Sequence, residues 1–246
     1  MEYALTRVQS QYGSRLAAGD WRRLEASHDL GQYLESARNS ALAPWVFPLD
    51  RHRDAHVIER SLRSAWRRYV NVVAAWHPRC WQPWLAWLEW LPSLALLAQL
   101  ARTEPAPAWL LADSVIGPAA AGTAVERLAA LEGTTLAGFE PAIAGRLPLA
   151  ELWVARWREL QPPADPLTEQ LLAAVCRAVQ EHARRLEAES ADADMLRDQL
   201  RERLKGLFRA AAGTVVATLC HLTLMALDFE RLRGGLVTRA VFATDK

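Results

Sequence analysis

Apolar residues recur at every third or fourth position along most of this chain, which is the period of one face of an α-helix. The clearest stretch runs from Asp54 to Trp76, with arginines on the opposite face. Its apolar positions are Ile58, Leu62, Ala65, Trp66, Tyr69, Val70, Val73 and Trp76. Strict alternation of apolar and polar residues, the pattern of a half-buried strand, is scarce. The sequence therefore predicts an all-α protein.

A second helix is expected directly after this one. His77 and Pro78 end the first helix, because proline cannot donate a backbone hydrogen bond and restricts the residue before it. The second helix begins near Arg79, with Pro83 in its first turn. Its wide apolar surface consists of Trp81, Trp84, Leu85, Leu88 and Leu91, with Trp87 and Trp90 beside them. We predict a multi-helix bundle of short and long amphipathic helices around this Trp-rich central helix pair, the second helix being covered by its own chain or by a partner.

Start and stop signals place the other helices. Asp29, Asp54 and Asp165 stand where a side chain can cap the first turn of a helix. Glycine commonly ends helices, and we expect this at Gly19 and at Gly234 with Gly235. The further expected helices span 3–18, 30–37, 123–131, 149–160, 166–186 and 195–211, with a last one after Gly213, and Trp45 to Phe47 is expected to form a loop between Pro44 and Pro48. The helices at 166–186 and 195–211 suit an antiparallel hairpin.

Proline and glycine divide the chain into three parts. Residues 1–101 form an N-terminal helical unit with the Trp-rich hub, 102–148 an irregular connecting segment punctuated by Pro and Gly, and 149–246 a C-terminal helical bundle. A chain of 246 residues also has the size of one domain. A single domain is therefore the alternative to this division.

Charge and cysteine content exclude several classes of protein. The formal net charge is +1 with acids and bases interspersed, so the chain lacks the long-range positive field of a nucleic-acid binder. Three distant cysteines without a CxxC pair indicate neither a disulfide framework nor a zinc knuckle, and fit a reducing cytoplasm. No signal peptide is visible. Glu89 interrupts the most apolar stretch, from Trp81 to Ala101, so no transmembrane segment is expected.

The sequence offers only weak candidates for metal-binding or catalytic residues. His52, His56 and Glu59 have the spacing of metal ligands on one helix face, but the start of a helix, with Asp54 as its cap, is the favoured interpretation. Cys220 and His221 lie inside an apolar helix and are interpreted as core residues. Since no phosphate-binding loop or nucleophile motif occurs either, the sequence predicts no enzyme activity and no cofactor.

The tryptophans allow two interpretations. Trp81, Trp84, Trp87 and Trp90 are the candidate interaction residues, because so wide an apolar stripe needs covering. The same tryptophans could line a pocket for an apolar ring such as a quinone or haem. Their helical spacing favours a packed core over such a pocket.

Two segments at opposite ends of the chain resemble one family. The first carries Tyr3, Ala4, Arg7, Val8, Leu16, Trp21, Leu24, Leu30 and Tyr33, followed by Ile58, Glu59 and Leu62; the second is Asp228, Phe229, Glu230, Arg231, Leu232 and Arg233. Together they resemble the C/d family of V-type ATPase subunits. The resemblance implies an all-helical, funnel-shaped, non-catalytic coupling subunit between a rotor stalk and a membrane ring.

The leading hypothesis is therefore an interaction or coupling subunit with a protein partner in a membrane-associated complex. On this hypothesis the chain is cytoplasmic and peripheral to the inner membrane. The alternatives are a helical ligand-binding module with a Trp-lined apolar pocket, or an all-helical bacterial scaffold protein.

Overall fold

The computed structural model describes residues 2–51, 54–102, 106–188 and 192–243, and all regular structure in these ranges is helical. The elements are α1 (Glu2–Gly13), α2 (Ala18–Glu25), α3 (Leu30–Arg38), α4 (Ala43–Val46), α5 (Ala55–Ala75), α6 (Gln82–Ala86), the 3-10 helix η1 (Trp87–Ser93), α7 (Leu94–Arg102), α8 (Ala108–Leu111), α9 (Gly117–Ala120), α10 (Ala124–Leu131), the 3-10 helix η2 (Ala137–Phe139), α11 (Glu140–Ile143), α12 (Leu149–Glu159), α13 (Pro166–Ala188), α14 (Ala193–Ala210) and α15 (Val215–Ala243). The predicted all-α class is confirmed.

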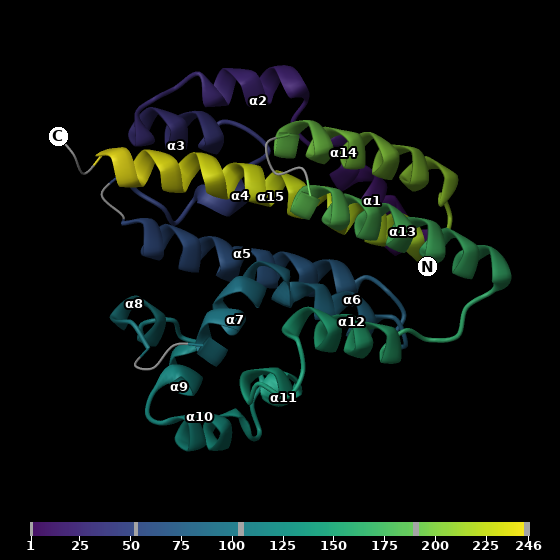
Figure 1. Ribbon diagram of the computed structural model, residues 1–246. Coiled ribbons are helices and arrows are strands. Elements are labelled where there is room, and N and C mark those ends of the chain that lie inside the picture. Colours follow the sequence, from purple (N-terminus) through teal and green to yellow (C-terminus); the bar gives the residue numbers. More distant parts are fainter. Residues whose placement is uncertain (1, 52–53, 103–105, 189–191, 244–246) are drawn as a thin grey trace.

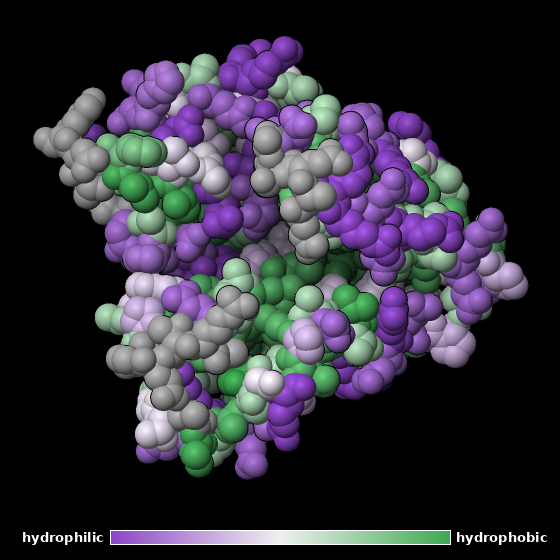
Figure 2. All heavy atoms as spheres, viewed as in Figure 1, coloured by the Kyte–Doolittle hydropathy of each residue, from purple (hydrophilic) through white to green (hydrophobic). Residues whose placement is uncertain are grey.

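The helices form two halves that meet at α5 (Figure 1). In the first half α15 packs against α1, α3, α5, α13 and α14, and the α13–α14 pair forms the predicted antiparallel hairpin. We call α1–α5 and α13–α15 the long-helix half. The second half, which we call the short-helix half, comprises α6–α12 with η1 and η2, and it meets α5 through α6 and η1. Polar residues cover most of the long-helix half in the view of Figure 2, whereas apolar residues are more frequent over the short-helix half.

One hydrophobic core runs through both halves. Buried side chains from all three predicted parts of the chain belong to it, including Trp66 of the first part, Phe139 of the second and Leu222 of the third. The segment 102–148 is thus packed onto the rest of the protein through apolar contacts. Its short helices contribute to the common core.

Three helix starts follow the predicted local chemistry. The carboxylates of Asp29, Asp54 and Asp165 each accept a hydrogen bond from the backbone N–H three residues later, at 2.9, 2.9 and 3.0 Å. Each bond satisfies one of the N–H groups that a helix start leaves without an intrahelical partner.

Two predicted helix ends were wrong. The first helix ends at Gly13, and Gly19 lies inside α2, where Asp20 accepts a hydrogen bond from the backbone N–H of Ala17. The early break leaves Arg15 outside the helix, in contact with α15. Gly235 does not end the last helix, because α15 continues to Ala243. A Cβ at Gly235 would lie 2.4 Å from the hydroxyl of Tyr33, so this glycine permits close packing inside a helix.

Proline explains two further differences between the predicted and the observed helices. The expected loop at Trp45 is the short helix α4, because Pro44 stands in its first turn, where proline fits. The second Trp-rich helix is interrupted by η1, which contains Pro92. Pro92 has no N–H to offer the carbonyl of Leu88. That carbonyl accepts a hydrogen bond from the indole of Trp66 instead, at 2.9 Å.

Candidate functional site

The four tryptophans proposed for interaction, Trp81, Trp84, Trp87 and Trp90, lie inside the short-helix half. Trp84 is 0 % exposed, Trp90 2 % and Trp81 8 %, and Trp87 is half-buried. Trp84 stacks on Trp157 with ring centroids 4.8 Å apart. The wide apolar stripe is covered by the protein's own helices, so these rings do not offer an exposed docking surface.

His56 and Glu59, two of the three metal candidates, have other partners in the structure. His52 lies outside the described residues. His56 is exposed, and its ring stacks on that of Trp109 at 4.8 Å. Glu59 forms an ion pair with Arg233 of α15 at 2.7 Å. Within the part of the chain that the structure describes, no group of three or more His, Cys, Asp or Glu side chains is placed to hold a metal ion.

Three ion pairs join the N-terminal segment and α5 to α15, and we call this contact the terminal junction. They link Arg15 to Asp228 at 2.7 Å, Glu25 to Arg231 at 2.5 Å and Glu59 to Arg233 at 2.7 Å. The first pair is the most buried, with side-chain exposures of 9 % and 5 %. Arg239 adds hydrogen bonds to the carbonyls of Glu25 and Ser27.

A cavity of about 470 Å³ opens beside the Arg15–Asp228 pair. One wall is a stripe of α5 at helical spacing, formed by Ala65, Arg68, Tyr69, Val72 and Trp76. The opposite wall comes from residues around α1, α2 and α4: Gln11, Ser14, Arg15, Leu16, Trp21, Ala41, Leu42, Pro44 and Trp45. Met225 and Asp228 of α15 complete the lining. The cavity therefore lies where four segments of the long-helix half converge.

Buried aromatic rings and a hydrogen bond between a tyrosine and a histidine lie next to the residues that line this cavity. Trp45 packs against Tyr69 and Phe229, with centroids 5.1 and 5.9 Å away. The hydroxyl of Tyr69 lies 2.6 Å from Nε2 of His221, which is fully buried, as predicted for a core residue. The pair holds the Tyr69 ring in place along the cavity wall.

Burial sets the protonation of these groups. It lowers the pKa of His221 to about 3, with the positive charge of Arg15 acting in the same direction, so this imidazole is neutral at neutral pH. Burial also raises the pKa of Tyr69. Asp228 has its pKa raised by burial, against the opposing effect of Arg15 and Arg201. The result is a neutral Tyr–His pair near a buried ion pair.

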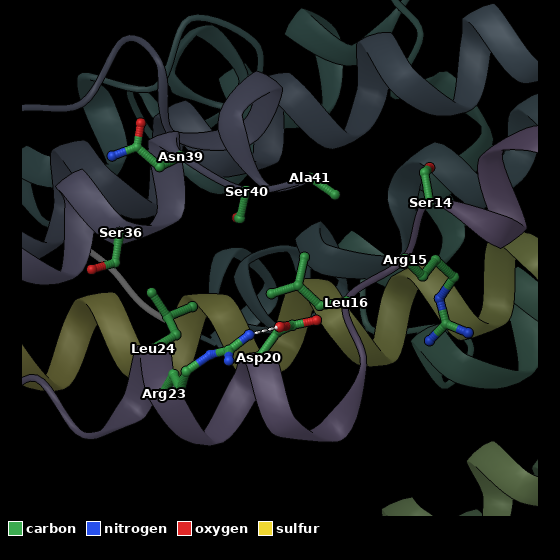
Figure 3. Close-up of a pocket in the computed structure, with 10 residues that line it drawn as sticks. All are labelled: Ser14, Arg15, Leu16, Asp20, Arg23, Leu24, Ser36, Asn39, Ser40 and Ala41. Atoms are coloured by element: carbon green, nitrogen blue, oxygen red, sulfur yellow. Dashed lines mark hydrogen bonds and ion pairs between the residues drawn. The ribbon is translucent and has the colours of Figure 1, made fainter.

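A second cavity, of about 480 Å³, adjoins the first and shares Ser14, Arg15, Leu16 and Ala41 with it. Its lining is more polar, and Figure 3 shows Ser36 of α3 and Asn39 just beyond its end on one side, with Asp20, Arg23 and Leu24 of α2 on the other. The two cavities together give the long-helix half a polar recess next to an aromatic one.

Sequence reasoning did not identify this site. Arg15 and Asp228 are 213 positions apart, and no local pattern connects them. Trp45 was assigned to a loop, and Tyr69 to the buried face of α5. The sequence feature that could have indicated this site is Asp228, a carboxylate at the end of an apolar stretch. A buried carboxylate requires a cationic partner.

The chain matches no known family model, no curated protein and no solved structure. Among the described residues, every helix is too short or too polar to span a lipid bilayer.

Proposed function

We propose that this protein is a non-catalytic coupling or interaction subunit, similar to the C/d family of V-type ATPase subunits, that links a rotor stalk to a membrane ring. The terminal junction is the observation that carries the proposal. The residues that resemble the family lie in two segments, 3–62 and 228–233, at opposite ends of the sequence.

Matching positions from the two segments touch each other. Glu59 pairs with Arg233 at 2.7 Å, and the guanidinium of Arg231 lies 4.9 Å from the ring centroid of Trp21. Glu59, Arg233 and Trp21 are among the positions on which the resemblance rests, whereas Arg231 stands where the family commonly has Asn. Positions that match a family by chance would be scattered over the fold, whereas these build one contact. This clustering supports a shared structural unit.

The matching apolar positions are also packed. Buried in the core are Ala4, Val8, Trp21, Leu24, Leu30, Tyr33, Ile58, Leu62, Phe229 and Leu232. They bring α1, α3 and α5 onto the last helix, and α2 packs on α3. A packed helical unit of this kind suits a subunit that transmits force between partners.

The test is co-purification from the native host. The tagged protein is recovered from membranes solubilised in mild detergent, and mass spectrometry quantifies rotary-ATPase stalk and ring subunits. We expect these subunits to be enriched with the protein. Recovery of a partner-free monomer would contradict the proposal.

Two adjacent glycines provide matched variants. Gly235→Ala places a Cβ 2.4 Å from the hydroxyl of Tyr33 and disturbs the terminal junction, whereas a Cβ at Gly234 meets nothing within 4 Å. Both changes favour helix propensity equally. We expect Gly234→Ala to retain the partner subunits and Gly235→Ala to lose them.

A further inference from the structure

The aromatic cavity beside Arg15 and Asp228 has the features of a small-molecule site. Its volume of about 470 Å³ falls within the range of pockets that enclose a small organic ligand. More of its accessible lining is apolar than polar, and a few charged groups converge on it. The proposed coupling role does not use this cavity.

The aromatic rings that line the cavity indicate the shape of the ligand that would fit it. Tyr69 and Trp76 of α5 are half-buried and line the cavity, with the exposed side chain of Val72 between them. Trp21 and Trp45 are buried in the opposite wall. The half-buried rings of Tyr69 and Trp76 give the cavity an accessible aromatic surface, which favours a planar ring because stacked rings gain from both burial and their quadrupoles.

The charged residues of the lining indicate which charge a ligand should carry. Two arginines, Arg15 and Arg68, line the cavity against one acid, Asp228. Arg15 neutralises Asp228, and among the described residues Arg68 has a hydrogen bond to the hydroxyl of Ser64 and no acidic partner. The guanidinium of Arg7 lies 5.4 Å from the ring centroid of Trp76, so a third arginine stands beside a residue of the lining. An organic cation would meet this excess positive charge, whereas an anion would be attracted.

We propose that this cavity binds a planar aromatic carboxylate, with its ring against Tyr69 and Trp76 and its carboxylate at Arg68. Arg68 is exposed, so the carboxylate stays near solvent at the rim while the ring is buried. This placement avoids the cost of moving a full charge into the core. Tyr69 is the ring-contacting residue, held by its bond to His221.

Three probes with one ring system and different charge test the proposal. Naphthoate, naphthamide and naphthylmethylammonium are titrated into the full-length protein by isothermal calorimetry. We expect saturable binding of naphthoate at one site per chain, weaker binding of the neutral amide and weakest binding of the cation. A flat naphthoate titration, or tighter binding of the cation, would overturn the proposal.

Two variants locate the site. Arg68→Gln is expected to weaken naphthoate binding by about threefold to fivefold, the range for one solvent-exposed ion pair, and to leave naphthamide binding unchanged. Arg22→Gln, an exposed arginine on α2 outside the cavity lining, is the matched control. Equal weakening of naphthoate by both changes would show non-specific attraction and refute the assignment.

Ala65→Leu fills the cavity from the α5 wall and removes no native polar contact. We expect this variant to unfold at or near the wild-type temperature and to lose at least tenfold in naphthoate affinity. A folded Ala65→Leu protein that binds naphthoate with wild-type affinity would place the ligand elsewhere. Decanoate serves as a shape control, and tighter binding of this flexible chain than of naphthoate would refute the planar-ring specificity.

Discussion

Both halves of the protein contain a dense aromatic cluster, yet the two clusters have different surroundings. The closed cluster of the short-helix half consists of Trp81, Trp84, Trp87, Trp90, Phe139, Trp153 and Trp157. The cavity-side cluster of the long-helix half consists of Trp21, Trp45, Trp66, Tyr69, Trp76 and Phe229. The first is sealed by its own helices, whereas the second lines an open cavity beside a buried ion pair.

Polar groups account for this difference. In the closed cluster the indole N–H groups of Trp84, Trp153 and Trp157 are buried and have no hydrogen-bond partner within the described structure. These three rings therefore act as apolar bulk, whereas the indole of Trp87 donates a hydrogen bond to the carbonyl of Trp153. The cavity-side cluster contacts His221 and borders Arg15 and Asp228, which must be paired when buried. Aromatic density alone thus marks a core, and its combination with converging charges marks a candidate site.

The largest expected effect is in the closed cluster. Trp84→Ala should lower the free energy of unfolding by about 3–5 kcal/mol, since it removes a fully buried indole and leaves a cavity. Urea denaturation measures this. Trp84→Phe should cost less than Trp66→Phe, because only Trp66 donates a hydrogen bond, to the carbonyl of Leu88. Equal losses of unfolding free energy for Trp84→Phe and Trp66→Phe would contradict the difference in hydrogen bonding between these two tryptophans.

The buried ion pair should give the next largest effect. Arg15→Met leaves Asp228 without its closest cation, and we expect a loss of about 3 kcal/mol in unfolding free energy. Adding Asp228→Asn should recover part of the loss, because the uncompensated charge is then removed. Arg146→Met, which breaks the exposed pair with Glu140, is the control and should cost about 1 kcal/mol or less. If Arg15→Met lowered the unfolding free energy as little as Arg146→Met does, the Arg15–Asp228 pair would be exposed to solvent.

The smallest effect is the pH dependence that His221 adds to the cavity-side cluster. The unfolded imidazole takes up a proton near pH 6.5 and the folded one only near pH 3. Between these values the unfolded state binds more protons, so the free energy of unfolding falls as the pH is lowered, by about 2 kcal/mol at pH 5. His221→Gln should reduce this slope in denaturation experiments at pH 7 and pH 5, and the remaining slope comes from His77, whose pKa burial lowers to about 4. His56→Gln, at an exposed position, should leave it unchanged; a wild-type slope in His221→Gln would contradict the buried neutral imidazole.

Local signals in the sequence predicted the helix starts well and the glycines poorly. A cap involves residues three positions apart, so Asp29, Asp54 and Asp165 were identified from their neighbours alone. The role of Gly235 depends on Tyr33, which is about two hundred positions away. A helix-ending and a helix-packing glycine look the same in the sequence, because the difference lies in what approaches them.

The sequence by itself determined the all-α class, most helix positions and the tryptophans as packed residues, because all of these follow from periodicity and neighbours a few positions apart. Only the tertiary structure decided that the tryptophan stripe is covered by the protein's own helices, that Arg15 meets Asp228, and that Trp45 and Tyr69 face a cavity. These contacts join residues far apart along the chain. Such pairings depend on how whole helices pack, which no local spacing specifies.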